Sequence, residues 1–265
     1  MRREEGMLAF LRRNCKNYVN NCFGKKSFVR IAILEDEKEL AQLYKLWLEA
    51  AGHSCTIFPA GQTFIKTVSR DSFDLLLLDW MLPDINGDEV LKWVRTHIDW
   101  HIPVIFVTMR DEEKDIVYAL ENGADDYLVK PVKTLELQAR IMAVSRRAKL
   151  NVAEKEILRI SSYTINNSDR SLSRGGVPVK LTNKEFELAA FLFRNAGRLL
   201  SRNHILDSVW GRGPGLNTRT VDTHASRIRN KLELSGKYGL TLKAVYHYGY
   251  RLENSGAESN SVGAA

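Results

Sequence analysis

Five short apolar runs, separated by segments with helical periodicity, constrain the fold of this chain more than any other feature. The runs are FVRIAIL, SCTIFPA, FDLLLLD, PVIFVT and DYLVK, which begin at residues 28, 54, 73, 103 and 126. Such runs are typical of strands buried on both faces of a parallel sheet, and helices are the usual crossovers between parallel strands. The pattern predicts a doubly wound α/β domain with a five-stranded parallel sheet over residues 28–147.

The predicted crossover helices fall at residues 38–52, 61–69, 88–96 and 112–122, and a last helix follows the fifth strand at 134–147. The first of them, KELAQLYKLWLEAAG, stops at Gly52, a residue type common at helix ends. Its helical periodicity places five side chains on one apolar stripe: Leu40, Leu43, Tyr44, Trp47 and Leu48.

The second half of the chain has a different pattern of predicted secondary structure. We expect a charged linker at residues 148–156, and then an α+β domain over 157–253 with short strands, three helices and a C-terminal hairpin or edge ribbon. Its first helix opens with a capping box formed by Thr182 and Glu185. Residues 254–265 are small and polar, which predicts a disordered tail.

Residues 1–27 form a basic extension whose apolar run is broken by Arg12 and Arg13, a poor secretory signal. A basic helix, a disordered arm and an upstream start codon all remain open for it. The three cysteines have no metal-ligand spacing, which indicates a reducing compartment, and we expect a cytoplasmic protein. Because no apolar run approaches the ~20 residues of a membrane helix, membrane insertion is not expected.

The net charge of +7 divides unevenly along the chain. Residues 28–147 hold 14 Lys and Arg against 20 Asp and Glu, whereas residues 148–265 hold 18 against 10. An acidic half joined to a basic half indicates two domains with different partners, and nucleic acid is a candidate partner for the basic one.

Polar residues gather where the predicted strands end. Parallel strands bring these positions to one edge of the sheet, where ligands bind in open α/β folds. Three carboxylates crowded there would repel one another, and their hard oxygen atoms favour Mg²⁺. The alternative is that each of these is an ordinary polar residue at a strand end. That alternative must account for five residues at once: Glu35, Asp36, Asp79, Thr108 and Lys130.

With a cation present, Asp79 on the central strand could act as a nucleophile towards phosphorus. Asp36 and Glu35 would hold the metal, and the Lys130 ammonium would help to neutralise the phosphoryl oxygen atoms. Thr108 could donate a hydrogen bond to the attached phosphoryl group.

ILEDE, LLLLDWMLPDINGDEVL, VIFVTMR and GADDYLVKP together resemble the receiver domain of two-component response regulators. The resemblance implies that a sensor histidine kinase phosphorylates Asp79. It also implies Mg²⁺ bound by Glu35, Asp36, Asp79 and the backbone carbonyl of Trp80. Thr108 and Tyr127 would rearrange on phosphorylation, Lys130 would contact the phosphoryl group, and the Lys130–Pro131 bond would be cis.

One position departs from the family pattern. The residue after the switch threonine is commonly Ala, whereas here it is the larger Met109. The lifetime and rate of phosphorylation therefore cannot be carried over from the family.

The third helix of the basic half, TRTVDTHASRIRNKL, has an apolar stripe of Val221, Ala225, Ile228 and Leu232. Its other faces mix arginines with small polar side chains, which suits entry into a major groove. A merely solvated face is the alternative. Together with AVYHYGYRL, this helix resembles the winged helix-turn-helix effector domain of the OmpR/PhoB family.

This second resemblance implies binding of double-stranded promoter DNA, with RNA polymerase as a further partner. Arg227 is the expected base reader, and four residues of the helix would mostly touch phosphates: Arg219, Thr220, His224 and Arg229. Thr223 and Arg251 are further expected DNA contacts. The wing of the family often carries Arg-Gly where this chain has Tyr246 and His247, so Tyr246 would stack on sugar or touch a phosphate instead.

The resemblance also implies that phosphorylated receivers form a homodimer. Asp126, Glu136 and Arg140 match the charged positions of the family interface. A further interface position that is usually basic is Ile116 here, so one salt bridge is missing. Because surface ion pairs contribute about 0–1 kcal/mol each, this loss need not prevent pairing.

A phosphorylation-switched transcription regulator, not an enzyme, is the leading interpretation. The second is a phosphohydrolase with an aspartyl nucleophile, but such enzymes usually carry an acid two residues later, where this chain has Met81. The third is a constitutive DNA-binding protein whose receiver senses something other than phosphate.

Overall fold

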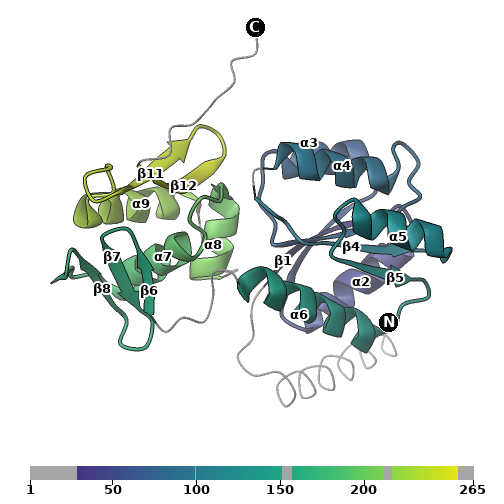
Figure 1. Cartoon of the computed structure of the whole chain (residues 1–265), viewed down its shortest axis with the longest axis horizontal. Helices are drawn as coiled ribbons and strands as arrows, with labels where there is room; N and C mark the ends of the chain where they lie inside the picture. Colours follow the sequence, from purple (N-terminus) through teal and green to yellow (C-terminus); the bar gives the residue numbers. More distant parts are fainter. Residues whose placement is uncertain (1–28, 99, 151–156, 212–216, 256–265) are drawn as a thin grey trace, which may run out of the picture. The chain divides into compact units, whose positions relative to one another are not determined.

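The computed structural model describes residues 29–98, 100–150, 157–211 and 217–255. They fall into two compact units, the first comprising the described residues of 29–69 and 73–149 and the second residues 70–72, 150 and the described residues from 157 onwards (Figure 1). The predicted extension 1–27, most of the linker and residues 256–265 lie outside the described residues. Among the residues described, none of the helices combines the length and apolar character needed to cross a bilayer.

The first unit contains the predicted five-stranded parallel sheet, and its strands lie in the order β2-β1-β3-β4-β5. The strands are β1 (Arg30–Leu34), β2 (Ser54–Phe58), β3 (Leu75–Leu78), β4 (Val104–Thr108) and β5 (Asp126–Val129). The helices are α2 (Lys38–Ala50), α3 (Gly61–Val68), α4 (Gly87–His97), α5 (Glu113–Glu121) and α6 (Thr134–Leu150).

Each face of this sheet is covered by helices, which explains why its strands are apolar throughout. Tyr44 of α2 and Leu137 of α6 belong to one core cluster, and Phe64 of α3, Leu91 of α4 and Ala119 of α5 belong to the other. Helices α2 and α6 therefore cover one face, and α3, α4 and α5 the other (Figure 1). The four leucines of β3 are buried between these layers.

The helix pattern is confirmed, apart from shifts of one or two residues at the ends of α2 to α5 and two larger differences. Leu43 was expected on the apolar stripe of α2 but is exposed, whereas Tyr44 and Leu48 are buried. Helix α6 continues to Leu150, three residues beyond its predicted end. The peptide bond between Lys130 and Pro131 is cis, as expected.

The second unit contains two small sheets and three helices. The sheets are an antiparallel one in the order β6-β7-β8-β9 and a three-stranded one in the order β10-β12-β11. Their strands are β6 (Ile157–Ile160), β7 (Tyr163–Asn166), β8 (Ser171–Arg174), β9 (Val177–Pro178), β10 (Leu200–Ser201), β11 (Leu240–Val245) and β12 (Gly249–Asn254). The helices are α7 (Asn183–Arg194), α8 (Arg202–Trp210) and α9 (Arg219–Leu232).

Local contacts explain how this unit holds α7 and α9. The capping box of α7 is confirmed: the Glu185 amide donates to Thr182 Oγ1 at 3.4 Å, and the Thr182 amide donates to Glu185 Oε2 at 2.8 Å. The buried Tyr163 hydroxyl donates to the Leu232 carbonyl at 2.8 Å, which satisfies a carbonyl in the last turn of α9.

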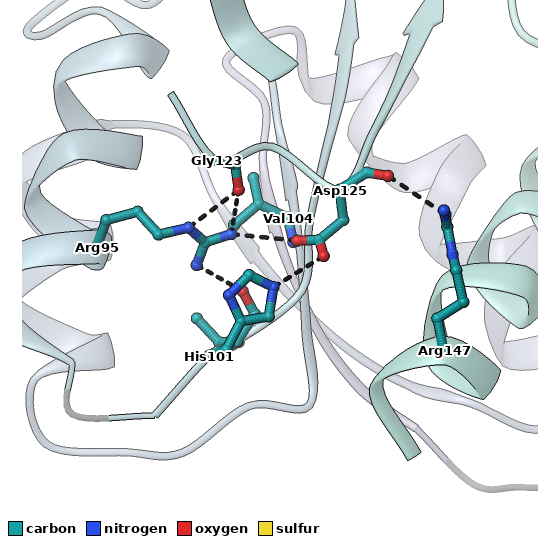
Figure 2. Close-up of polar contacts among 7 residues, drawn as sticks. Arg95, His101, Val104, Gly123, Asp125 and Arg147 are labelled. Carbon is teal, nitrogen blue, oxygen red and sulfur yellow. Dashed lines mark hydrogen bonds and ion pairs between the residues drawn. The ribbon is translucent and has the colours of Figure 1, made fainter. Parts of the chain in front are cut away.

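A polar network fixes the amino-terminal end of β4 and β5 (Figure 2). Arg95 of α4 donates to the Gly123 carbonyl at 2.6 and 3.0 Å, to the Ile102 carbonyl at 2.7 Å and to Asp125 Oδ2 at 3.1 Å. The same carboxylate accepts the Val104 amide at 2.9 Å, and its other oxygen lies 2.8 Å from His101 Nε2. This network joins the loop before β4 to the turn before β5.

Candidate functional site

The carboxyl ends of the central strands bring the five predicted polar residues together. Glu35 and Asp36 follow β1, Asp79 follows β3, and Thr108 ends β4. Lys130 follows β5 and completes the group. The arrangement follows from the parallel sheet, since β1, β3, β4 and β5 are consecutive neighbours and end at the same edge.

Three carboxylates lie close enough to share one cation. Glu35, Asp36 and Asp79 each offer an oxygen atom, and these atoms lie within 4.8 Å of one another. Glu35 and Asp79 are only 3% and 6% exposed, whereas Asp36 is exposed. The donors are all hard oxygen atoms in a partly buried cluster, which is a set that suits Mg²⁺.

The Lys130 ammonium lies between the two buried carboxylates. Its Nζ is 2.6 Å from Asp79 Oδ2 and 2.8 Å from Glu35 Oε2. Burial opposes the charge on Lys130, but the hydrogen bonds and charges of Asp79 and Glu35 outweigh burial and raise the lysine pKa. Burial is also the main reason why the pKa of Glu35 rises to about 7, despite the opposing effect of Lys130.

Backbone contacts position Asp79. Its amide donates to the Leu34 carbonyl at 2.9 Å, and its Oδ1 accepts the Trp80 amide at 2.5 Å. The Trp80 carbonyl accepts the Gly87 amide at 2.8 Å, so it is engaged in the backbone; its expected role as a metal ligand stays a prediction. Gly87 is required here, because a Cβ at this position would lie 2.1 Å from the Asp79 carbonyl oxygen.

The two expected switch residues contact the loop that follows β4. Thr108 is fully buried, and its Oγ1 accepts the Arg110 amide at 3.4 Å. The Tyr127 hydroxyl donates to the Arg110 carbonyl at 3.0 Å, and burial raises the pKa of Tyr127 to about 12. Met109 is 61% exposed beside them. Sequence reasoning missed Arg110, whose only signal was its position two residues after Thr108.

The predicted interface residues pair within the chain. Arg140 of α6 lies 3.3 Å from Asp126 of β5 and 3.7 Å from Glu136 of α6. Ile116 packs against the core rather than standing at the surface as a basic residue would. Helices α5 and α6 and strand β5 together carry five exposed large hydrophobic side chains: Val117, Tyr118, Leu120, Val129 and Leu135.

Helix α9 of the second unit presents part of the predicted DNA-contact set. Its apolar stripe is buried as predicted, from Val221 to Leu232. On the helix, Arg219, Thr223 and Arg227 are exposed. Asp222 holds α9 in place, because its Oδ1 accepts both Arg202 at 2.9 Å and the Tyr250 hydroxyl at 2.7 Å.

The other expected DNA contacts of α9 are half-buried and bonded within the protein. Arg229 donates to the Leu242 carbonyl of β11 at 2.9 and 3.1 Å. His224 Nδ1 lies 2.9 Å from the Thr220 carbonyl, and its ring meets the Trp210 ring edge to face at 5.0 Å. These contacts orient α9 in the free protein.

The hairpin of β11 and β12 forms the wing. Tyr246 in its turn is 85% exposed, and its ring lies 3.9 Å from that of His247. His247 has a φ of 56°, a left-handed conformation that tightens the turn. Arg251 on β12 is half-buried near Glu253.

Comparison with known proteins covers both units. Residues 31–142 match the response regulator receiver domain, and residues 176–252 match the C-terminal domain of transcriptional regulatory proteins. The sensory transduction protein RegX3 of Mycolicibacterium smegmatis is 38% identical over 226 residues, which span 84% of this chain and 98% of that protein.

The phosphate regulon transcriptional regulatory protein PhoB of Rhizobium meliloti is 38% identical over 227 residues, which span 85% of this chain and 99% of that protein. Among solved structures, the response regulator DrrB of Thermotoga maritima aligns with 86% of this chain and 100% of its own, at 26% identity and a TM-score of 0.42.

Proposed function

Because this chain belongs to the OmpR/PhoB family of response regulators, and so joins a receiver to a DNA-binding domain that regulates transcription, we propose that a sensor histidine kinase controls it by phosphorylating Asp79. The observation that carries the proposal is the position of Asp79. Its carboxylate lies beside Glu35 and Asp36 and contacts Lys130 at 2.6 Å. We expect this two-component regulator to act in the cytoplasm.

The residues present fit a magnesium ion. The two buried carboxylates of Glu35 and Asp79 share the single Lys130 ammonium, so one negative charge lacks a matching positive charge. Glu35, Asp36 and Asp79 would hold the ion, which would supply positive charge to neutralise phosphoryl oxygen atoms. The Trp80 carbonyl is a further proposed ligand, because it accepts the Gly87 amide with one lone pair and keeps a second.

In the transfer itself, an oxygen atom of the Asp79 carboxylate attacks phosphorus and forms a new P–O bond. The bond from phosphorus to the imidazole nitrogen of the kinase histidine breaks, and that nitrogen takes up a proton from solvent. Lys130 neutralises charge on the phosphoryl oxygen atoms, and the Thr108 hydroxyl donates a hydrogen bond to one of them. The product is an acyl phosphate on Asp79.

Incubation of the full chain with acetyl phosphate and Mg²⁺ tests this step. Intact mass should rise by one phosphoryl group in the native chain and in Asp88→Asn, a control on α4, but not in Asp79→Asn. Continuous release of phosphate without a stable adduct would support a phosphohydrolase instead. No reaction of the native chain would support a receiver that senses something else, and either result would refute the proposal.

We further propose that phosphorylation pairs two chains through α5, β5 and α6, the elements that carry Asp126, Glu136 and Arg140. Two joined effector domains would bind two half-sites, and the second contact would gain from a high effective concentration. Sedimentation of the native chain with and without acetyl phosphate tests the pairing. An unchanged sedimentation coefficient would contradict it.

On DNA, Arg227 is the proposed base reader because it is exposed on α9, and the exposed side chains of Thr223 and Ser226 just before it are short. Arg227→Ala should relax base preference in binding-site selection from random DNA. Arg219→Ala should weaken binding to all sequences. It should also reduce the slope of log binding constant against log salt concentration by about one, the contribution of one phosphate contact. Lys180→Ala removes an exposed cation before α7 and should change neither; equal effects of all three variants would contradict the assignment.

A further inference from the structure

Arg110 contacts four separate parts of the receiver from the loop after β4. Its amide donates to Thr108 Oγ1 at 3.4 Å, and its carbonyl accepts the Tyr127 hydroxyl at 3.0 Å. Its guanidinium lies over the Trp80 ring, with Cζ 5.0 Å from the ring centroid. Nη1 also lies 3.1 Å from Asp115 Oδ2 in the first turn of α5. One residue therefore meets both switch side chains, the neighbour of Asp79 and the start of α5.

The Trp80 ring makes this junction stiff. Trp80 directly follows Asp79, its amide binds the Asp79 carboxylate, and its side chain is buried. The ring centroid lies 5.2 Å from that of Phe106 on β4 and 5.9 Å from that of Tyr118 on α5. A cation over an indole face is favourable, so the Arg110 guanidinium stabilises this aromatic group. The group extends from Trp80, next to the phosphoacceptor, to Tyr118 on α5.

We infer that Arg110 is the positioning residue that transmits the state of Asp79 to helix α5, an inference that rests on the function proposed above. In the structure the Thr108 oxygen is held by the Arg110 amide, and the guanidinium holds α5 through Asp115. A phosphoryl group on Asp79 competes for Thr108. When the threonine moves to it, the loop that carries Arg110 loses its bond to Thr108, and the contacts with Trp80 and Asp115 change together.

This role requires two conformations of the receiver that differ at Arg110. The phosphoryl group must interact more favourably with one of them, because a ligand shifts a conformational equilibrium only through such a difference. The contacts meet this requirement, since the backbone of Arg110 senses Thr108 while its side chain acts on α5. Helix α5 belongs to the proposed pairing surface. Arg110 therefore affects how far phosphorylation raises DNA affinity, rather than the transfer to Asp79 itself.

The test compares the DNA affinity of the full chain before and after treatment with acetyl phosphate and Mg²⁺, at equal phosphate occupancy measured by intact mass. The DNA is a fragment obtained by binding-site selection with the native chain. Four proteins are compared: the native chain, Arg110→Gln, Arg110→Lys and the control Lys92→Gln. Lys92 is a matched control because its ammonium lies over another ring of the same aromatic group, that of Tyr118 at 5.5 Å. Among the described residues, however, no contact joins Lys92 to Thr108, Tyr127 or Asp115.

The native chain should gain affinity by about 5- to 150-fold, the usual range for coupled sites. Arg110→Gln should keep less than about a third of that gain, whereas Arg110→Lys should recover most of it because a cation remains over the indole ring. Lys92→Gln should keep the full gain. Recovery by lysine separates positioning from a general loss of structure.

A full gain in Arg110→Gln would overturn the inference while leaving the proposed function intact. No gain in the native chain would instead refute the proposed function. If Arg110→Gln does not fold, as judged by its thermal unfolding, Asp115→Asn breaks the same contact from α5. That variant should then reduce the gain, and an unreduced gain would overturn the inference.

Discussion

The stability of the receiver should depend on pH through Glu35. The pKa of this buried carboxyl rises from its ordinary value of 4.5 to about 7, chiefly because burial disfavours its charged form. Between these pH values the folded state holds a proton that the unfolded state has lost, so the free energy of unfolding falls as pH rises. At about 1.4 kcal/mol for each pKa unit, the loss amounts to about 3 kcal/mol.

Urea unfolding of the native chain and Glu35→Gln at pH 5 and pH 8, without divalent ions, measures this loss. Tryptophan fluorescence follows the receiver, because four of the five tryptophans lie in it. Glutamine mimics the protonated carboxyl, so Glu35→Gln should be more stable than the native chain at pH 8 by up to about 3 kcal/mol, and similar to it at pH 5. Glu121→Gln changes an exposed glutamate on α5 and should behave like the native chain.

Magnesium should remove the difference, because a cation bound by the same carboxylates favours the charged form of Glu35. The native chain should therefore gain more stability from Mg²⁺ at pH 8 than at pH 5, and Glu35→Gln should gain little at either. The reasoning fails if Glu35→Gln keeps the pH dependence of the native chain, since the proton would then belong to another group.

Three further substitutions test the packing. Gly87→Ala places a Cβ against the Asp79 carbonyl and should cost about 1–3 kcal/mol in thermal unfolding while slowing phosphate uptake; an unchanged protein would contradict the close approach. Arg95→Ala leaves two loop carbonyls without a donor and should cost about 2–4 kcal/mol in urea, against at most about 1 for the surface control Arg140→Ala. Tyr163→Phe loses one buried hydrogen bond to α9 and should cost about 1 kcal/mol; no loss would show that water replaces it.

Periodicity predicted the elements that bury a continuous face. Three predicted features are confirmed: the five parallel strands, the capping box at Thr182 and the buried stripe of α9. They could be predicted because each depends on residues that are close together in the sequence. The exposure of Leu43 could not be read this way. An apolar residue at the margin of a helical stripe is buried only if another element covers it, and that depends on the tertiary fold.

The same limit applies to short strands and to side-chain partners. Strand β10 has only two residues and is defined by its pairing with β12, so it has no period of its own. The sequence indicated that Arg229 was basic and on α9, but not that it would bind the Leu242 carbonyl. Asp79, Glu35 and Lys130 could be predicted to meet because parallel strands end at a common edge, whereas the role of Arg110 depends on contacts of a loop.

Helix α5 is anchored differently at its two ends. Its first turn contacts Arg110 through a single half-exposed ion pair, while the turn after it is tied to α4 by the Arg95 network. A helix that is held at one end and weakly held at the other moves mainly by rotation about the held end. Displacements caused by chemistry at Asp79 should therefore be largest near Asp115 and decrease towards Gly123.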